Sequence, residues 1–212
     1  MKKGLFISVE GIDGAGKSTH VNFICEYLKS KGKTVVVTRE PGGTPLGEQI
    51  RNLLLHSTNM HHNTELLLMF ASRQELIEKI IFPNLKDGIC VVADRFVDAS
   101  LAYQGAGRGL GMAKVKQLIN LLEPVLTTDL TFLFNVPLSI AVNRIAKNRN
   151  KDRIEEENED FFTKVQNAYL DIAKAQPDRM KVINTNRLKS ETRNEIIQHL
   201  DYLLDKQNDA PL

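Results

Sequence analysis

The sequence predicts a three-layer α/β domain, and three observations carry that prediction. Short runs rich in β-branched and aromatic residues alternate with longer stretches of helical periodicity, which is the order of βαβ units. Several of the short runs, such as residues 89–93, are apolar throughout. Such runs favour a parallel sheet that helices cover on both faces. The length of 212 residues suits one domain with elaborations better than two independent domains.

The elements follow one another in strict alternation along the chain. Each expected strand is a run of Val, Ile, Leu, Phe or Thr, and each expected helix repeats apolar residues every three or four positions. The expected strands are residues 5–9, 34–38, 89–93, 130–136 and 180–184. The expected helices are residues 17–30, 46–56, 64–80, 113–122, 138–147, 160–175 and 191–206. We find no repeat or flexible linker, so residues 1–206 are expected to form a single domain, followed by a frayed tail at 207–212.

Composition excludes several classes of function. The 28 basic residues nearly balance the 26 acidic ones, and a net charge of +2 gives no general field for a nucleic acid or a membrane surface. Any bound anion must therefore be held by a local site. No apolar run approaches the roughly 18 residues of a membrane helix. Cys25 and Cys90 are too few for a disulfide framework and are expected as buried thiols, which favours a reducing cytoplasm.

A phosphate-binding motif follows the first expected strand directly. Residues 11–19 read Gly11-Ile12-Asp13-Gly14-Ala15-Gly16-Lys17-Ser18-Thr19, which satisfies G-x-x-x-x-G-K-[ST] in the strand–loop–helix setting that it requires. The glycines let backbone N–H groups point at phosphate oxygens, and the next helix directs its positive dipole end to the same place. Lys17 is expected to reach the β- and γ-phosphates, and the Ser18 hydroxyl to bind Mg²⁺. Asp13 is expected near the metal or the transferred phosphoryl group.

A second anionic site is expected at the same sheet edge. The strand at 89–93 is followed by Asp94 and Arg95, and ligands of open α/β sheets bind at the carboxyl ends of the strands. Asp94 can bind Mg²⁺ directly or through a water molecule. Arg95 can make a bidentate contact with phosphate oxygens, or it can simply pair with Asp94. Arg39, after the second strand, and Arg51, on the next helix, add positive charge there. These cations predict that a second phosphate binds beside that of a nucleoside triphosphate.

The phosphate loop leaves the acceptor of the phosphoryl group open. A kinase passes it to a small molecule, whereas a GTPase or ATPase switch passes it to water. The guanine-reading pattern Asn-Lys-x-Asp is absent, since Asn84-Leu85-Lys86-Asp87 has similar letters in another order. This absence weakens the GTPase interpretation.

Six motifs in sequence order, between about residue 4 and about residue 185, closely resemble those of bacterial thymidylate kinases. They are Glu10-Gly11-x-Asp13-Gly14-x-Gly16-Lys17-Ser18-Thr19, Arg39-Glu40-Pro41-Gly42-Gly43-Thr44, Phe70-Ala71-Ser72-Arg73, Asp94-Arg95-Phe96, Ser100-x-x-Tyr103-Gln104-Gly105 and Asp152-Arg153-x-Glu155. The resemblance implies a P-loop nucleoside-monophosphate-kinase fold, with a five-stranded parallel sheet in the order 2-3-1-4-5 and a short lid at about 144–156. It also implies transfer of the γ-phosphoryl of ATP to dTMP with Mg²⁺, in a homodimer. The nearest alternative is a kinase for another nucleoside monophosphate or for a deoxynucleoside.

The resemblance also implies which cations surround the migrating phosphoryl group. Lys17 and Arg95 are expected there, with Asp13 beside them. The phosphate loop holds Ala15 and no arginine. Family members whose loop lacks an arginine use one from the lid instead. The resemblance therefore implies that Arg149 supplies this cation, with Arg153 beside it. A charge run such as 144–153 can also be a solvated helix face.

Base recognition is expected from the helix at 64–80 and from the segment after Asp94. Arg73 can donate to a carbonyl such as thymine O4, where cytosine carries an amino group. Gln104 offers a donor and an acceptor to the imide edge, and Tyr103 resembles the residue that crowds the sugar 2′ position. The base-stacking Phe of the family usually lies four residues before this Arg, where Met69 stands, so either Met69 or Phe70 can cover the ring. The other expected substrate contacts are Arg39, Glu40, Arg51, Leu53, Arg95 and Ser100. The five histidines show no metal-ligand spacing, so no metal is expected beyond the Mg²⁺ carried by ATP.

Overall fold

The computed structural model describes residues 3–146 and 152–209, with residues 145, 146 and 209 described for their backbone alone. Within these ranges the chain forms one five-stranded sheet in the order β2-β3-β1-β4-β5. All four strand pairings are parallel, and the expected fold class and strand order are confirmed. The strands are β1 (Phe6–Glu10), β2 (Val35–Arg39), β3 (Cys90–Asp94), β4 (Leu130–Asn135) and β5 (Met180–Asn184).

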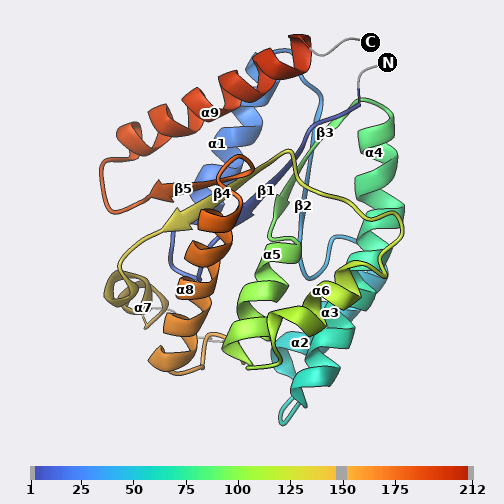
Figure 1. The fold of residues 1–212 in the computed structure, drawn as a ribbon, viewed down its shortest axis with the longest axis vertical. Coiled ribbons are helices and arrows are strands. Elements are labelled where there is room, and N and C mark those ends of the chain that lie inside the picture. The colour runs from blue at the N-terminus through green and yellow to red at the C-terminus, as the bar shows by residue number, and fades with distance from the viewer. Residues whose placement is uncertain (1–2, 147–151, 210–212) are drawn as a thin grey trace.

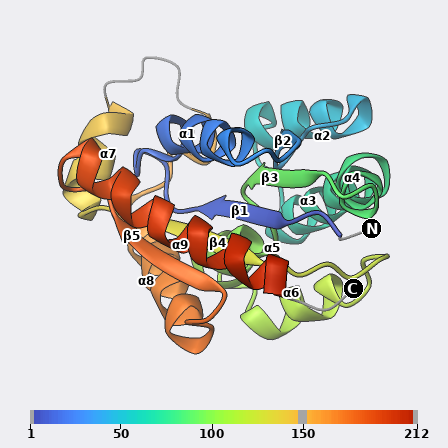
Figure 2. The ribbon, with the colours of Figure 1, turned by 90° about the horizontal axis from the view of Figure 1, so that it is seen from above.

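Helices cover both faces of the sheet (Figure 1). Figure 2 shows α1 and α9 on one face and α5 and α8 on the other. The helices are α1 (Lys17–Ser30), α2 (Pro45–His56), α3 (His62–Leu76), α4 (Phe82–Lys86), α5 (Val97–Ser100), α6 (Met112–Ile119), α7 (Leu138–Ala146), α8 (Glu159–Ala175) and α9 (Lys189–Asp209). Two π-helical segments, η1 (Ile77–Ile81) and η2 (Leu101–Gly107), complete the described elements. None of the helices in the described part of the chain is long and apolar enough to span a membrane.

The central strand β1 lies in the core along its whole length. All five residues of β1 are buried, and Phe6, Ile7 and Val9 are at most 1% exposed. A fully buried side chain of this size stabilises the fold by about 1.5–3 kcal/mol. Ser8, the polar residue between them, shares a hydrogen bond of 2.7 Å with the Thr131 hydroxyl of β4, so its burial leaves no unpaired hydroxyl.

The structure differs from the expected elements at several places, and three of these differences affect the helices that surround the site or the end of the chain. The helix expected to end at residue 80 continues through η1 and α4 to Lys86, with Pro83 in the first turn of α4. The segment after Phe96 folds into α5 and η2, which were not predicted because two glycines mask its helical pattern. The tail expected to fray from residue 207 remains helical to Asp209, since Gln207 accepts from Lys33 Nζ and donates to the Lys3 carbonyl. Residues 210–212 lie outside the described residues.

Candidate active site

The phosphate loop joins β1 to α1, and its backbone requires glycine. Gly14 and Gly16 have positive φ angles of 78° and 91°, a region that other residues enter with strain. A Cβ atom on Gly14 would also lie 2.5 Å from the Ala141 carbonyl oxygen of α7. Helix α1 begins after Gly16 with no side-chain cap. Its first N–H groups are therefore available to an anion.

The Lys17 side chain lies in the loop that its own motif forms. Its Nζ donates to the carbonyls of Gly11 (3.0 Å) and Ile12 (3.1 Å), and to Asp13 Oδ1 (3.3 Å). Burial lowers the pKa of Lys17, the positive charge of Arg95 lowers it further, and Asp13 opposes both. A phosphate group that replaced these three acceptors would meet a cation already in place.

Asp13 contacts three groups, which are Lys17 of its own loop and Arg95 and Tyr103 from segments further along the chain. Its Oδ1 lies 2.6 Å from Arg95 Nη2, and its Oδ2 accepts from the Tyr103 hydroxyl at 3.2 Å. Burial opposes ionisation, but the charges of Arg95 and Lys17 outweigh it and hold the pKa of Asp13 well below its usual value. Asp13 is therefore a carboxylate at physiological pH.

Arg95 is held in a strained backbone conformation. Its φ of 73° is in the left-handed region, which few residues other than glycine adopt. The next amide, Phe96 N–H, donates to Oε1 of the buried Glu10 side chain at 2.7 Å. Glu10 also accepts from the Tyr169 hydroxyl at 2.8 Å, and Arg95 Nη1 lies 3.4 Å from that same hydroxyl oxygen. The alternative pairing of Arg95 with Asp94 is not what holds it, since its hydrogen bonds go to Asp13, Gly11, Tyr103 and Tyr169.

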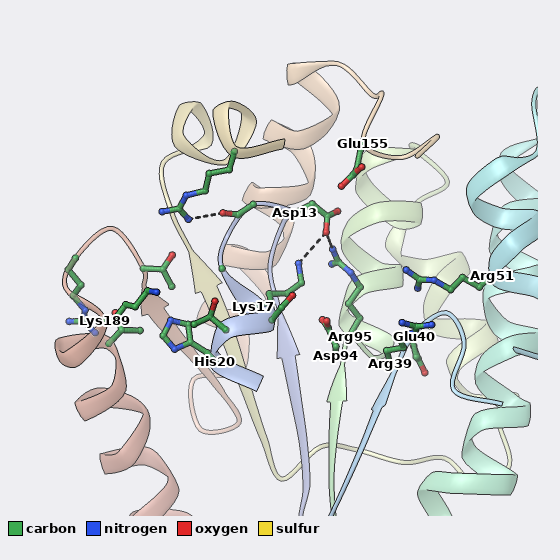
Figure 3. Close-up of a pocket in the computed structure, with 18 residues that line it drawn as sticks. Asp13, Lys17, His20, Arg39, Glu40, Arg51, Asp94, Arg95, Glu155 and Lys189 are labelled. Carbon is green, nitrogen blue, oxygen red and sulfur yellow. Dashed lines mark hydrogen bonds and ion pairs between the residues drawn. The ribbon is translucent and has the colours of Figure 1, made fainter. Parts of the chain in front are cut away.

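A cavity of about 740 Å³ opens above the carboxyl ends of the strands, and we call it the larger cavity. Figure 3 shows Lys17 at its centre, His20 and Lys189 on one side, and Arg39 and Arg51 on the other. Ser18 and Asp94 both line it. Asp94 Oδ1 is buried without a partner among the described residues, so one carboxylate oxygen is free to meet a ligand.

A smaller cavity lies next to the larger one and is lined in part by residues of α2, α3 and η2. Met69, Tyr103 and Gln104 line it together with apolar residues. Asp13, Glu40, Arg51 and Arg95 line both cavities. The two cavities therefore share a rim that carries two guanidinium groups and two carboxylates.

Arg73 is buried beside the smaller cavity and is almost fully paired. Its Nε and Nη2 donate to Glu40 Oε2 at 2.8 and 2.6 Å, and Nη2 also donates to Ser100 Oγ at 3.0 Å. The Phe70 ring lies 4.7 Å from the guanidinium carbon, in a cation–π contact. Arg73 Nη1 is buried and has no partner within residues 3–146 and 152–209. A buried free N–H of this kind is a ready donor for a ligand oxygen.

Some expected site residues lie elsewhere. Leu53 was expected to contact the substrate, but it is 50% exposed on α2, and Leu55 lines the smaller cavity instead. Met69 lines that cavity, whereas Phe70 packs on Arg73. Arg153 is bound by Glu65 at 2.7 Å and by the Leu54 carbonyl, and it does not line the larger cavity. Arg149 lies outside the described residues.

The structure adds cavity residues that sequence reasoning missed. Arg144 of α7 donates to the Gly14 carbonyl at 2.8 Å, and Thr185, Arg187 and Lys189 line the larger cavity beyond the end of β5. His20 faces the same space from α1 and stacks on Phe134. The signal for the three residues after β5 was present, because the rule that ligands bind at the carboxyl ends of strands applies to every strand.

Comparison with known proteins decides the family. The family model described as thymidylate kinase matches residues 9–196. The chain belongs to the thymidylate kinase family. The family resemblance drawn from the motifs is thereby confirmed, and the enzyme class is that of dTMP kinases.

Individual thymidylate kinases are similar along almost the whole chain. The thymidylate kinase of Methylobacillus flagellatus is 50% identical over 195 residues, which cover 92% of this chain and 96% of that protein. The thymidylate kinase of Neisseria meningitidis is 48% identical, covering 94% and 97%. The crystal structure of thymidylate kinase from Ehrlichia chaffeensis superposes with a TM-score of 0.78 at 34% identity, covering 93% of this chain and 99% of that one. Fold and sequence therefore agree on the family.

Proposed function

We propose that this thymidylate kinase binds ATP in the larger cavity and dTMP in the smaller one, and transfers the γ-phosphoryl group across their shared rim to give ADP and dTDP. The observation that supports this arrangement is the rim itself, where Arg95 and Arg51 lie between the two cavities. Two anionic phosphates repel each other unless cations separate them. Cations at the junction of two cavities suit an acceptor that is itself a phosphate.

Positioning and charge neutralisation supply most of the catalysis in phosphoryl transfer. Lys17 binds the β- and γ-phosphates and gives up its present bonds to the loop carbonyls. Arg95 binds phosphate oxygens at the rim, where Asp13 and Glu10 fix its guanidinium and its backbone. No general base is required, because the acceptor phosphate is already an anion near neutral pH. Arg149 completes the set of cations from the lid.

Base recognition follows from the unpaired atoms near the smaller cavity. Arg73 Nη1 donates to thymine O4, and Gln104 Oε1, which also lacks a partner among the described residues, accepts from thymine N3–H. Cytosine presents an amino group in place of O4 and an acceptor in place of N3–H, so both protein groups would stay unpaired. A site of this kind rejects the unmatched base strongly. Met69 covers the ring, and Tyr103 crowds the sugar.

Ser18 and Asp94 are the residues that would hold Mg²⁺. A hydroxyl and a carboxylate with one buried, unpaired oxygen fit a hard cation that keeps water and nucleotide phosphates as its other ligands. When bound there, Mg²⁺ would neutralise charge on the ATP phosphates. Within the described residues there is no cluster of three or more His, Cys, Asp or Glu side chains that could hold a further metal.

The proposed site is part of a single kinase domain that acts as a cytoplasmic homodimer. Two leucines of α2, Leu46 and Leu53, are 47% and 50% exposed, and a spacing of seven residues places them on one helix face. An exposed apolar helix face is a candidate contact for a second copy of the chain. Near-neutral charge gives no reason to add a nucleic acid as a partner.

A substrate panel tests the proposal. ADP release is measured with saturating ATP and Mg²⁺ across dTMP, dUMP, dCMP, dGMP and thymidine. We expect kcat/KM to be highest for dTMP and to fall by about 10⁴-fold for dCMP. Faster turnover of any other acceptor would overturn the assignment of dTMP, and phosphate release independent of dTMP would indicate an ATPase.

A further inference from the structure

A second charged cluster surrounds Glu65 in the first turn of α3. The side chain is buried, and it accepts hydrogen bonds from three others. Gln104 Nε2 donates to Oε1 at 2.8 Å, Arg108 Nε lies 3.2 Å from both oxygens, and Arg153 Nη1 lies 2.7 Å from Oε2. The donors come from η2, from the turn that follows it and from the segment that precedes α8. Glu65 therefore connects the base-reading side chain to the end of the lid.

The charge of Glu65 determines which end of the Gln104 amide can face it. Burial opposes ionisation, but the hydrogen bond from Gln104 and the charges of Arg108 and Arg153 outweigh it and lower the pKa of Glu65. An ionised carboxylate carries no hydrogen and can only accept. The Gln104 group that faces it must therefore be the NH2 group. If the Gln104 carbonyl oxygen faced Glu65 instead, two acceptor oxygens would lie together with no hydrogen atom between them.

The other end of the same amide is left for a ligand. Gln104 is 1% exposed and lines the smaller cavity. Its Oε1 is buried and has no hydrogen-bond partner in the described part of the chain. Since the amide is planar, holding Nε2 on Glu65 also fixes the place of Oε1. A buried acceptor without a partner is costly until a donor reaches it.

We propose that Glu65 is a positioning residue that determines base selectivity, by holding the Gln104 amide so that a carbonyl oxygen rather than an NH2 group meets the base. The inference rests on the proposed function, in which that base is thymine. An oxygen at this position selects a ring N–H, the group that thymine carries at N3. The free Nη1 of Arg73 supplies the matching donor for the neighbouring carbonyl. Without Glu65 the amide can turn over and offer its NH2 group to cytosine N3.

A purely structural role for Glu65 makes a different prediction. In that case the carboxylate only neutralises Arg108 and Arg153, and its loss would lower the activity on all acceptors alike. Glu157 provides the comparison, because it also pairs with Arg108 but makes no hydrogen bond to Gln104. The ratio of kcat/KM for dTMP to kcat/KM for dCMP distinguishes the two roles. A positioning role predicts that this ratio falls when Glu65 is replaced, whereas a structural role predicts that only the overall activity falls.

The test compares Glu65→Gln with Glu157→Gln. Kinetics with saturating ATP give kcat/KM for dTMP, for dCMP and for dTMP methylated at N3. The amide that Glu65→Gln introduces can present either of its own ends, which releases Gln104. We expect Glu65→Gln to lower the dTMP-to-dCMP ratio by about 10- to 100-fold, to reduce the penalty for N3 methylation, and to leave the KM for ATP within about twofold. Glu157→Gln is expected to leave the ratio unchanged.

Three outcomes would overturn the inference. They are an unchanged ratio in Glu65→Gln, an equal fall of kcat/KM for every acceptor, and an equal fall of the ratio in Glu157→Gln. A wild-type protein that does not phosphorylate dTMP would instead overturn the proposed function, so the two failures are distinguishable.

A measurement on the wild-type protein covers the case in which Glu65→Gln does not fold. The side-chain NH2 resonance of Gln104 is assigned by its loss in Gln104→Met, and its hydrogen exchange is followed by NMR. We expect slow exchange with and without dTMP, because the NH2 group is buried against Glu65 throughout. Fast exchange in the free protein that becomes slow only with dTMP would show the opposite orientation and overturn the inference.

Discussion

At the scale of single residues, the site is a set of charges whose partners are already in place before any nucleotide binds. Asp13 is the clearest example, because it holds Lys17, Arg95 and Tyr103 at once. Fixed groups of this kind need little rearrangement when charge develops in the transition state. We therefore expect the removal of Lys17 or Arg95 to lower the rate of phosphoryl transfer much more than it lowers the stability of the fold.

Replacing either cation tests this directly. We expect Lys17→Ala and Arg95→Ala each to lower kcat by about 100-fold or more, since each removes a positive charge from the migrating phosphoryl group. The measurement is steady-state ADP release with dTMP, with thermal unfolding as the check on folding. Lys164→Ala, which removes a lysine whose side chain is 55% exposed, is the control and should retain full activity. A variant at Lys17 or Arg95 with normal kcat would remove that residue from the catalytic set.

Glu10 predicts a pH dependence of stability. Burial first, and then the negative charge of Asp98, raise the pKa of Glu10 from 4.5 to about 8. Between these values the folded protein holds a proton that the unfolded chain has released. Stability is therefore full below about pH 4.5 and falls by about 1.4 kcal/mol per pH unit until the folded group ionises.

Glu10→Gln removes this proton exchange. Its carbonyl oxygen still accepts from the Phe96 amide, and its NH2 group faces the Tyr169 hydroxyl, which then accepts a hydrogen bond instead of donating one. We expect the free energy of unfolding of Glu10→Gln, measured relative to that of the wild type, to increase as the pH rises from about 5 to about 8. Urea unfolding of both proteins across that range measures the difference. A constant difference between them would show that Glu10 does not titrate in this window.

At the scale of elements, the phosphate loop and α7 are in direct contact. Gly14 approaches Ala141 too closely for any side chain, and Arg144 binds the Gly14 carbonyl. Helix α7 leads toward the segment proposed as the lid, so these two contacts position that helix and the loop proposed to bind ATP relative to each other. A change at Gly14 should therefore affect ATP more than dTMP.

Gly14→Ala tests the contact, with Gly32→Ala as a matched control. Both glycines have a φ of 78°, but a Cβ on Gly32 meets no atom within 4 Å. Backbone strain should lower the stability of both variants by about 1 kcal/mol, and Gly14→Ala should lose more because its Cβ would also meet the Ala141 carbonyl oxygen. We expect only Gly14→Ala to raise the KM for ATP, by about 10-fold or more, with the KM for dTMP little changed. Equal kinetic effects in the two variants would exclude a specific role for the contact with α7.

The lid itself gives a prediction from the sequence. Arg149 is expected to supply the cation that Ala15 does not, so Arg149→Ala should lower kcat by about 100-fold or more. Arg153→Ala is a useful companion, because Arg153 is bound by Glu65 and by the Leu54 carbonyl. We expect it to act more on the KM for dTMP than on kcat. An unchanged kcat in Arg149→Ala would make the lid assignment wrong.

At the scale of the whole molecule, the residues that the structure places in the larger cavity as expected are those whose position follows from the end of a strand. Lys17, Asp94 and Arg95 are of this kind, because parallel strands bring their carboxyl ends to one edge. Sequence reasoning was less reliable on helices, where the direction of a side chain depends on packing. Leu53 and Leu55 differ by two positions, so they point to different sides of α2, and the sequence does not show which side faces the cavity.

The network of Glu65 was not predictable for a related reason. Its partners Gln104, Arg108 and Arg153 lie 39, 43 and 88 residues further along the chain, and no local pattern links them. The segment that contains Gln104 was not predicted as helical either. A buried carboxylate with three donors becomes visible only once tertiary contacts place the three segments together.

The proposed homodimer is a prediction for the whole molecule. In a two-fold symmetric dimer a single exposed leucine of α2 is buried twice, so Leu53→Asp would introduce two charges at once. We expect wild-type protein at micromolar concentration to sediment at twice 23.9 kDa, and Leu53→Asp to raise the dimer dissociation constant by about 100-fold or more. Leu188→Asp, at a leucine that is 69% exposed between β5 and α9, is the control and should remain dimeric. Sedimentation velocity measures all three proteins. A monomeric wild type would make the homodimer prediction wrong, and a dimer that survives Leu53→Asp would move the interface away from this face of α2.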